Sequence, residues 1–94
     1  MVSDLAPVHP GEILDEEFLK PLNLTAYRIA QLVHVPRTRI ERLARRETPV
    51  TPDTALRLGR LFGTTPEFCM NLQTRYDLLT AKPADLAQIE PLVA

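Results

Sequence analysis

Apolar side chains recur at three- and four-residue spacing along most of the chain, which is the pattern of α-helices that bury one face. The first half holds three such stretches, at residues 10–19, 26–33 and 37–45. Pro21 ends the first stretch, and Thr25 is placed to cap the N-terminus of the second. The positions expected to face inward are Ile13, Leu14, Phe18, Ile29, Ala30, Val33, Ile40 and Leu43. The first half therefore predicts three helices, and the third is mostly polar outside its two inward positions.

Two more helices are predicted in the second half, each opened by a threonine directly before a proline. Thr51 and Thr65 stand at N-cap positions, and Pro52 and Pro66 take the first helical positions, where a missing N–H costs nothing. Gly63 lies where a left-handed C-cap belongs. The last helix carries an apolar seam formed by Phe68, Leu72, Tyr76 and Leu79. No segment shows the alternating, β-branched pattern of a strand, so the predicted fold is all-α.

Length and composition indicate one folded domain. Ninety-four residues suit a single hydrophobic core, and a chain with 45% apolar and 24% charged residues is not expected to be disordered. The core is expected to cover about residues 8–80, followed by a tail over 81–94 with a short helical turn around Leu86. The apolar stretches are far shorter than the ~20 residues that span a bilayer. The first residues also lack a signal-peptide pattern, so we expect a cytoplasmic protein.

Charge is segregated along the chain, although the net charge is only −1. Residues 28–46 carry six arginines against one acid, Glu41. These arginines are Arg28, Arg37, Arg39, Arg42, Arg45 and Arg46. Such a concentration of arginine is typical of phosphate contact and of bidentate recognition of guanine edges. The alternative interpretation is a solvated, charged helix face.

Residues 26–45 have the organisation of a helix-turn-helix unit, in which two short helices flank a tight turn and the second is rich in arginine and threonine. In that geometry the second helix enters the major groove, and the first meets the DNA backbone. Base or groove-wall contacts are predicted for Arg37, Thr38, Arg39 and Arg42. Phosphate contacts are predicted for Tyr27, Arg28, Arg45 and Arg46. Helical hairpins in ordinary bundles share the apolar pattern, so the pattern alone leaves both interpretations open.

Three separated motifs occur in order over residues 8–80. The first is His-Pro-Gly-Glu-Ile-Leu with Glu-Glu-Phe-Leu-Lys-Pro-Leu-Asn-Leu, within residues 9–24. The second is Val-Thr-Pro-Asp-Thr-Ala-Leu-Arg-Leu, at residues 50–58. The third is Phe-Gly-Thr-Thr-Pro-Glu-Phe at residues 62–68, continued by Asn-Leu-Gln and Tyr-Asp-Leu within residues 71–78. Together they resemble the HigA family of antitoxins, a branch of the XRE-type, lambda-repressor-like helix-turn-helix proteins.

The resemblance implies a compact five-helix fold, a homodimer, and an operator that overlaps the protein's own promoter. It also implies neutralisation of a HigB-type toxin, a RelE-like ribonuclease that cuts messenger RNA. The family's recognition helix maps onto residues 36–45, so Arg37, Thr38 and Arg39 inherit the DNA-facing role.

The chain departs from the family pattern at three places. His34 stands where family members usually have glycine, so histidine must accept a left-handed backbone there. Arg45 and Arg46 stand where Asn-Gly is common, a change expected to lengthen the helix or strengthen phosphate binding. Cys69 often corresponds to tryptophan, which leaves a smaller side chain beside the apolar seam.

Several alternatives remain open at this point. The protein could be a stand-alone repressor without a toxin, or a helical module whose arginines bind an acidic protein. The apolar seam could be core in part or a dimer interface. The acids Glu12, Asp15, Glu16 and Glu17 could be a dipole-favoured, solvated face or a surface that meets a basic toxin. Cys69, His9 and His34 have no partners at catalytic or metal-ligand spacing, so no enzyme activity, metal or cofactor is expected.

Overall fold

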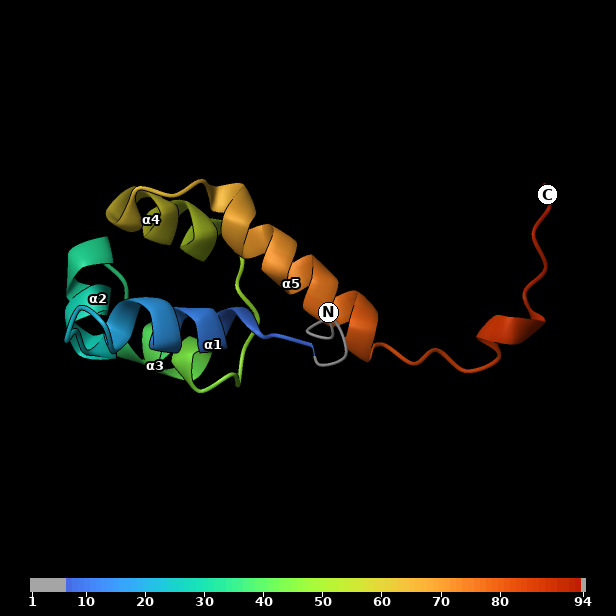
Figure 1. Ribbon diagram of the computed structural model, residues 1–94, viewed down its shortest axis with the longest axis horizontal. Coiled ribbons are helices and arrows are strands. Elements are labelled where there is room, and N and C mark those ends of the chain that lie inside the picture. The colour runs from blue at the N-terminus through green and yellow to red at the C-terminus, as the bar shows by residue number, and fades with distance from the viewer. Residues whose placement is uncertain (1–6, 94) are drawn as a thin grey trace.

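The computed structural model describes residues 7–93, and within that range it is all-helical (Figure 1). In chain order the elements are α1 (Pro10–Ile13), the π-helical η2 (Leu14–Leu19), α2 (Ala26–Val33), α3 (Arg37–Ala44), α4 (Pro52–Phe62), α5 (Pro66–Thr80) and the 3₁₀ turn η3 (Leu86–Gln88). Because α1 runs directly into η2, the fold has the five predicted helices, and the all-α prediction is confirmed. The turn predicted around Leu86 is also present.

The first helical segment covers the predicted residues 10–19 but changes its hydrogen bonding at Leu14. In η2 the backbone bonds reach back five residues, as in the bond from Lys20 N to Asp15 O at 3.0 Å. Bonding of this kind brings residues five apart toward the same side, and Leu14 and Leu19 are both buried. A regular helical period does not select Leu19 as a core residue, whereas the π turn does.

The core lies between α2, α3, α4 and the first helical segment. Ile29 and Ile40 have no exposed surface, and the small Ala30 is buried between α2 and its neighbours. Phe18 of η2 stacks on Phe62 of α4 with ring centroids 4.1 Å apart. The buried hydrophobic cluster as a whole comprises Leu14, Leu19, Ile29, Ala30, Val33, Ile40, Leu43, Val50, Ala55 and Leu58. In the first three helical stretches it contains the inward positions predicted from the sequence, except that Ile13 and Phe18 are only partly buried and that Leu19 is added.

Most helix ends follow the predicted capping signals. The Thr25 hydroxyl accepts from Arg28 N at 3.1 Å, and the Thr51 hydroxyl accepts from Thr54 N at 3.4 Å. Gly63 closes α4 in the left-handed conformation, with φ at 71°. Thr65 differs, because its side chain makes no capping bond and its backbone carbonyl accepts from Phe68 N instead.

Gly11 explains the first sequence motif. An added Cβ there would lie 1.8 Å from the carbonyl oxygen of Leu43, so only glycine lets α1 pass this close to the end of α3. His9 completes the junction, since its Nδ1 accepts from Gly11 N at 2.9 Å and caps α1. The His9 ring also meets Tyr76 of α5 edge-on, with centroids 4.9 Å apart. These contacts give His9 a structural role at the junction of α1 and α5.

Helix α5 starts against α4 and crosses toward α1, and the tail then leads away from the other helices (Figure 1). Gln73 is the buried polar anchor of this helix. Its Oε1 accepts from Val50 N at 2.7 Å and its Nε2 donates to Asp77 at 2.9 Å. Residues 81–93 are exposed throughout. The assignment of residues 1–94 to one domain, including residues 1–6 and 94 outside the described range, stays a prediction.

Candidate nucleic-acid interface

Helices α2 and α3 form the predicted helix-turn-helix unit. Helix α2 ends at Val33, and His34 then adopts the left-handed conformation with φ at 63°. The N–H of Val35 bonds to the carbonyl of Ala30 at 3.0 Å, and this bond closes the turn before α3 begins at Arg37. The expectation that histidine accepts this backbone is confirmed.

The outward face of α3 is set by its two buried residues. Ile40 and Leu43 point into the core. At 3.6 residues per turn, Thr38, Arg42 and Arg45 then lie on the opposite side, and all three are exposed. Arg42 has no ion pair with any residue in the range 7–93, so its guanidinium is available to an external acceptor. This row, Thr38, Arg42 and Arg45, is the outward ridge of α3.

Arg37 lies on the flank of α3 that faces α2. Its guanidinium carbon is 5.7 Å from the centre of the Tyr27 ring, and its Nε lies 3.2 Å from Oε2 of Glu41. Gln31 links the rest of this group. It donates to the Tyr27 hydroxyl at 3.1 Å and accepts from Arg28 at 3.4 Å. The fold thus joins Arg37, Tyr27 and Arg28, and it adds Gln31, which its spacing of three and four residues from Arg28 and Tyr27 could have indicated.

Arg39 lies on the opposite flank, which faces α4. Its Nη1 donates to the carboxylate of Asp53 in an exposed ion pair. The same carboxylate oxygen accepts from Arg57 Nε at 3.0 Å, and Arg57 Nη1 donates to the carbonyl of Val33 at 2.8 Å. Hydrogen bonds from Arg57 and then Arg39 hold the pKa of Asp53 below its ordinary value. Sequence reasoning missed both Asp53 and Arg57, although their i, i+4 spacing on one helix is a recognisable ion-pair signal.

The region between α3 and α4 is a groove that carries three arginines and one acid. It is lined by Pro36, Thr38, Arg39, Arg42, Leu43, Thr48, Pro49, Thr51, Asp53, Thr54 and Arg57. Three guanidinium groups and one carboxylate give this groove a net positive charge. Thr38 and Arg42 of the outward ridge belong to it, so the Arg39 flank continues the face that α3 presents outward.

The two consecutive arginines at the end of α3, Arg45 and Arg46, do not lengthen the helix. Helix α3 stops at Ala44, and Arg46 takes the left-handed conformation with φ at 64°. Arg45 pairs with Glu47 at 3.3 Å, whereas Arg46 turns toward α1 and lies 3.9 Å from Glu12. An eight-residue helix is roughly 12 Å long, so both arginines lie at the far end of α3 from Arg37. Arg46 therefore makes the left-handed turn at the end of α3, at the position where the family pattern commonly has glycine.

The apolar seam of α5 divides between the core and the surface. Leu72 and Tyr76 are half-buried against the first helical segment and His9, whereas Phe68 and Leu79 are 41% and 43% exposed. Leu78, which is not one of the predicted seam residues, is 75% exposed. The C-terminal end of α5 therefore displays leucine side chains that no residue of the described chain covers.

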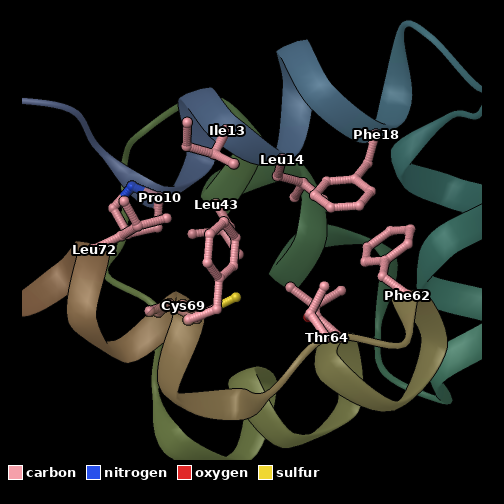
Figure 2. Close-up of a pocket in the computed structure, with 12 residues that line it drawn as sticks. Pro10, Ile13, Leu14, Phe18, Leu43, Phe62, Thr64, Cys69 and Leu72 are labelled. Atoms are coloured by element: carbon pink, nitrogen blue, oxygen red, sulfur yellow. The ribbon is translucent and has the colours of Figure 1, made fainter.

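Cys69 borders a small apolar cavity between the first helical segment and α5 (Figure 2). The cavity measures about 20 Å³, and Leu72, Phe68 and Pro10 are among the residues that line it. Burial raises the pKa of the Cys69 thiol, which keeps it protonated and weakly nucleophilic.

Residues 7–93 contain neither a metal-binding cluster nor a membrane-spanning helix. No group of three or more His, Cys, Asp or Glu side chains in this range could hold a metal ion. None of the helices in the same range is long and apolar enough to cross a membrane.

Known proteins resemble this chain over most of its length. No family model matches the sequence. Virulence-associated protein I of Dichelobacter nodosus is 45% identical over 80 residues, which cover 85% of this chain and 74% of that protein. Antitoxin HigA-1 of Vibrio cholerae is 36% identical over 72 residues, covering 77% of this chain and 68% of that protein.

A solved structure agrees in both fold and sequence. Pseudomonas aeruginosa antitoxin HigA, in a structure with the higBA promoter, superposes with a TM-score of 0.86 at 39% identity. The match covers 94% of this chain and 100% of that one. The helix-turn-helix unit, the five-helix order and these relatives agree, and the chain belongs to the HigA family of helix-turn-helix antitoxins.

Proposed function

We propose that this protein is a sequence-specific DNA-binding antitoxin of a type II toxin-antitoxin system. As a homodimer it binds an operator in its own promoter and represses its own operon. It also neutralises a HigB-type, RelE-like toxin that cuts messenger RNA. The observation that carries the proposal is the arginine-lined outward face of α3 in a chain related to a HigA antitoxin whose structure includes the higBA promoter.

The reading element is α3, inserted into the major groove. Thr38 and Arg42 of the outward ridge meet base edges, with Arg37 and Arg39 on either side of them. Arg45 and Arg28 are the phosphate contacts, assisted by Tyr27 and Arg46. Four of these arginines pair with carboxylates, Arg37 with Glu41, Arg39 with Asp53, Arg45 with Glu47 and Arg46 with Glu12. Exposed ion pairs are weak, so phosphates and base edges can replace the carboxylate partners of Arg37, Arg45 and Arg46 on binding.

The dimer forms through the seam of α5, with Phe68, Leu72, Tyr76 and Leu79 as its apolar contacts. A two-fold arrangement places the two α3 helices about one duplex turn apart, roughly 34 Å, or bends the DNA to meet them. Binding to the operator places the protein in the cytoplasm. Its action is binding alone, since neither DNA reading nor toxin neutralisation asks this chain for a chemical step.

Arginine substitutions test the reading role. Arg37→Ala and Arg39→Ala are each expected to weaken operator binding about tenfold, because a good arginine contact to a base edge is worth about 1–3 kcal/mol. Arg60→Ala on α4 and Arg75→Ala on α5 are matched controls, since both arginines are exposed and neither lies on α2 or α3. Operator affinity unchanged in both test variants would contradict the proposal.

Co-expression tests the antitoxin role separately. The protein and its Arg37→Ala variant are each produced with the toxin encoded beside the gene, and growth is followed. Both are expected to restore growth, because α3 reads DNA and the toxin is bound without it. Growth arrest with both, despite intact operator binding by the unmodified protein, would contradict the antitoxin role and indicate a stand-alone repressor.

A further inference from the structure

We propose that Asp53, at the start of α4, determines operator specificity by fixing the orientation of Arg39. This inference rests on the proposed function and adds a positioning residue to the DNA-reading face. It concerns the chain of contacts that runs from Arg39 through Asp53 and Arg57 to the end of α2.

An acid on a DNA-reading face calls for an explanation. Asp53 lines the same groove as Thr38 and Arg42, and its side chain is 55% exposed. An unpaired carboxylate there would repel the phosphate backbone. Two guanidinium groups donate to the same oxygen of Asp53. Their positive charges offset the charge of the carboxylate, which serves as a fixed acceptor. The carboxylate is therefore placed to hold arginines.

The acceptor is itself held in place. Arg57 Nη1 donates to the Val33 carbonyl at 2.8 Å, and Val33 is the last residue of α2. A cation at the C-terminal end of a helix is favoured by the helix dipole and by its free carbonyls. Arg57 thus ties α4 to α2 and presents its Nε to Asp53, so the Asp53 carboxylate has a defined position relative to both helices of the reading unit.

This arrangement limits what Arg39 can bind. Nη1 of Arg39 is engaged by Asp53, and the other guanidinium N–H groups remain to donate. An arginine on a long flexible chain would otherwise find the nearest phosphate on any duplex. Held from its flank, Arg39 keeps its remaining donors beside Thr38 and Arg42, where a base edge can use them. Asp53 therefore lowers binding to unrelated DNA and supports binding to the operator.

The chain offers a matched control for the charge effect. Glu47 pairs with Arg45 at the other end of α3, and its side chain is 54% exposed against 55% for Asp53. Asp53→Asn and Glu47→Gln remove one negative charge each with little change of shape. Arg57→Lys keeps the charge but loses the forked geometry that joins Val33 to Asp53.

The experiment measures the affinity of each variant for a duplex of the protein's own promoter and for an unrelated duplex of equal length. Asp53→Asn is expected to bind the unrelated duplex several-fold more tightly and to lose about tenfold in the promoter-to-unrelated ratio. Arg57→Lys should lower the promoter-to-unrelated ratio without binding the unrelated duplex more tightly. Glu47→Gln should bind both duplexes more tightly and keep the ratio. Thermal melting of each variant checks that it is folded.

The outcomes separate the two proposals. A promoter preference that Asp53→Asn keeps in full would overturn the role of Asp53 and leave the proposed function standing. An equal fall of the ratio in Glu47→Gln and Asp53→Asn would overturn it too, because charge alone would then be the cause. An unmodified protein that does not prefer its promoter would overturn the proposed function, and this inference with it.

Discussion

The helix-turn-helix unit and the region from α5 to the tail differ in what they leave exposed. Where α2 packs on α3, the apolar side chains Ile29, Ala30, Val33, Ile40 and Leu43 are buried, although Tyr27 and Leu32 of α2 remain exposed, and the outer face carries arginines whose charges are mostly paired. From the end of α5 onward the exposed side chains include Leu78, Leu79 and Leu86. The first region buries the contact between its two helices, whereas the second presents leucines that no residue in the range 7–93 covers.

The contrast assigns different partners to the two regions. A face of exposed cations is suited to a polyanion, because phosphates can replace weak surface ion pairs. Exposed leucines are suited to another apolar surface, and a second copy of α5 supplies one. Substitutions in the first region should therefore affect stability or DNA binding, and substitutions in the second should affect assembly.

The largest effect is expected from the core of the first region. Ile40→Ala should lower the free energy of unfolding by about 2–5 kcal/mol, because it opens a cavity at a side chain with no exposed surface. Urea denaturation measures the change. Leu56→Ala on exposed α4 surface is the control and should stay within about 0.5 kcal/mol. Similar losses for the two would show that α3 is not packed as described.

The second region should respond in assembly instead. Leu79→Glu is expected to weaken dimerisation by about tenfold or more, because a charge would be placed in an apolar interface. Sedimentation equilibrium measures the association constant, and Leu56→Glu serves as the control. A Leu79→Glu protein that dimerises as tightly as the unmodified one would rule out the α5 seam as the interface.

A smaller effect is expected from pH, at the junction of the two regions. Burial, followed by the nearby charge of Arg46, lowers the pKa of His9 below its ordinary value of 6.5, and Asp77 and Glu12 oppose the shift. As pH falls below 6.5, the unfolded chain binds a proton that the folded chain disfavours, so stability present above 6.5 is lost as pH falls toward the lowered pKa. The loss is about 1.4 kcal/mol for each unit by which the pKa is lowered.

Substitution of His9 tests this pH effect. Because asparagine also caps helices, His9→Asn should keep α1 and flatten the dependence of Tm on pH between 7 and about 5. His34→Asn is the control, since asparagine accepts the left-handed backbone, and it should keep the slope. An unchanged slope in His9→Asn would contradict the assignment.

The smallest effect concerns the end of α3. Arg46→Gly should raise the free energy of unfolding by up to about 1 kcal/mol, because glycine adopts a left-handed backbone without the steric cost that arginine bears. Arg45→Gly removes the same charge at a φ of −85° and should be neutral or destabilising. The two variants are compared by thermal denaturation. Equal effects would show that the left-handed backbone at Arg46 does not cause the change in stability.

The sequence predicts most of the fold because its helix ends are marked by local signals. Thr25, Thr51 and Gly63 each act within a few residues, and the structure uses them as expected. The π turn of η2 could not be predicted in this way, because it depends on the packing of Leu14 and Leu19 against distant helices.

The candidate site is predicted less completely, for the same physical reason. The arginines of α3 are visible as a cluster along the chain, and they are exposed as expected. Asp53 is 14 residues from Arg39 and meets it only because the fold places the start of α4 across the groove from α3. The spacing of residues shows pairs on one helix, such as Asp53 and Arg57, but contacts between helices require the fold.

The function proposed for α3 is to read operator DNA through its arginines. A salt titration of binding to the protein's own upstream promoter, beside an unrelated duplex of equal length, tests it most directly. We predict a promoter preference of at least about a thousandfold, with affinity that falls steeply as salt rises because bound arginines release counterions from phosphates. Equal affinity for the two duplexes at every salt concentration would show that α3 does not read the operator.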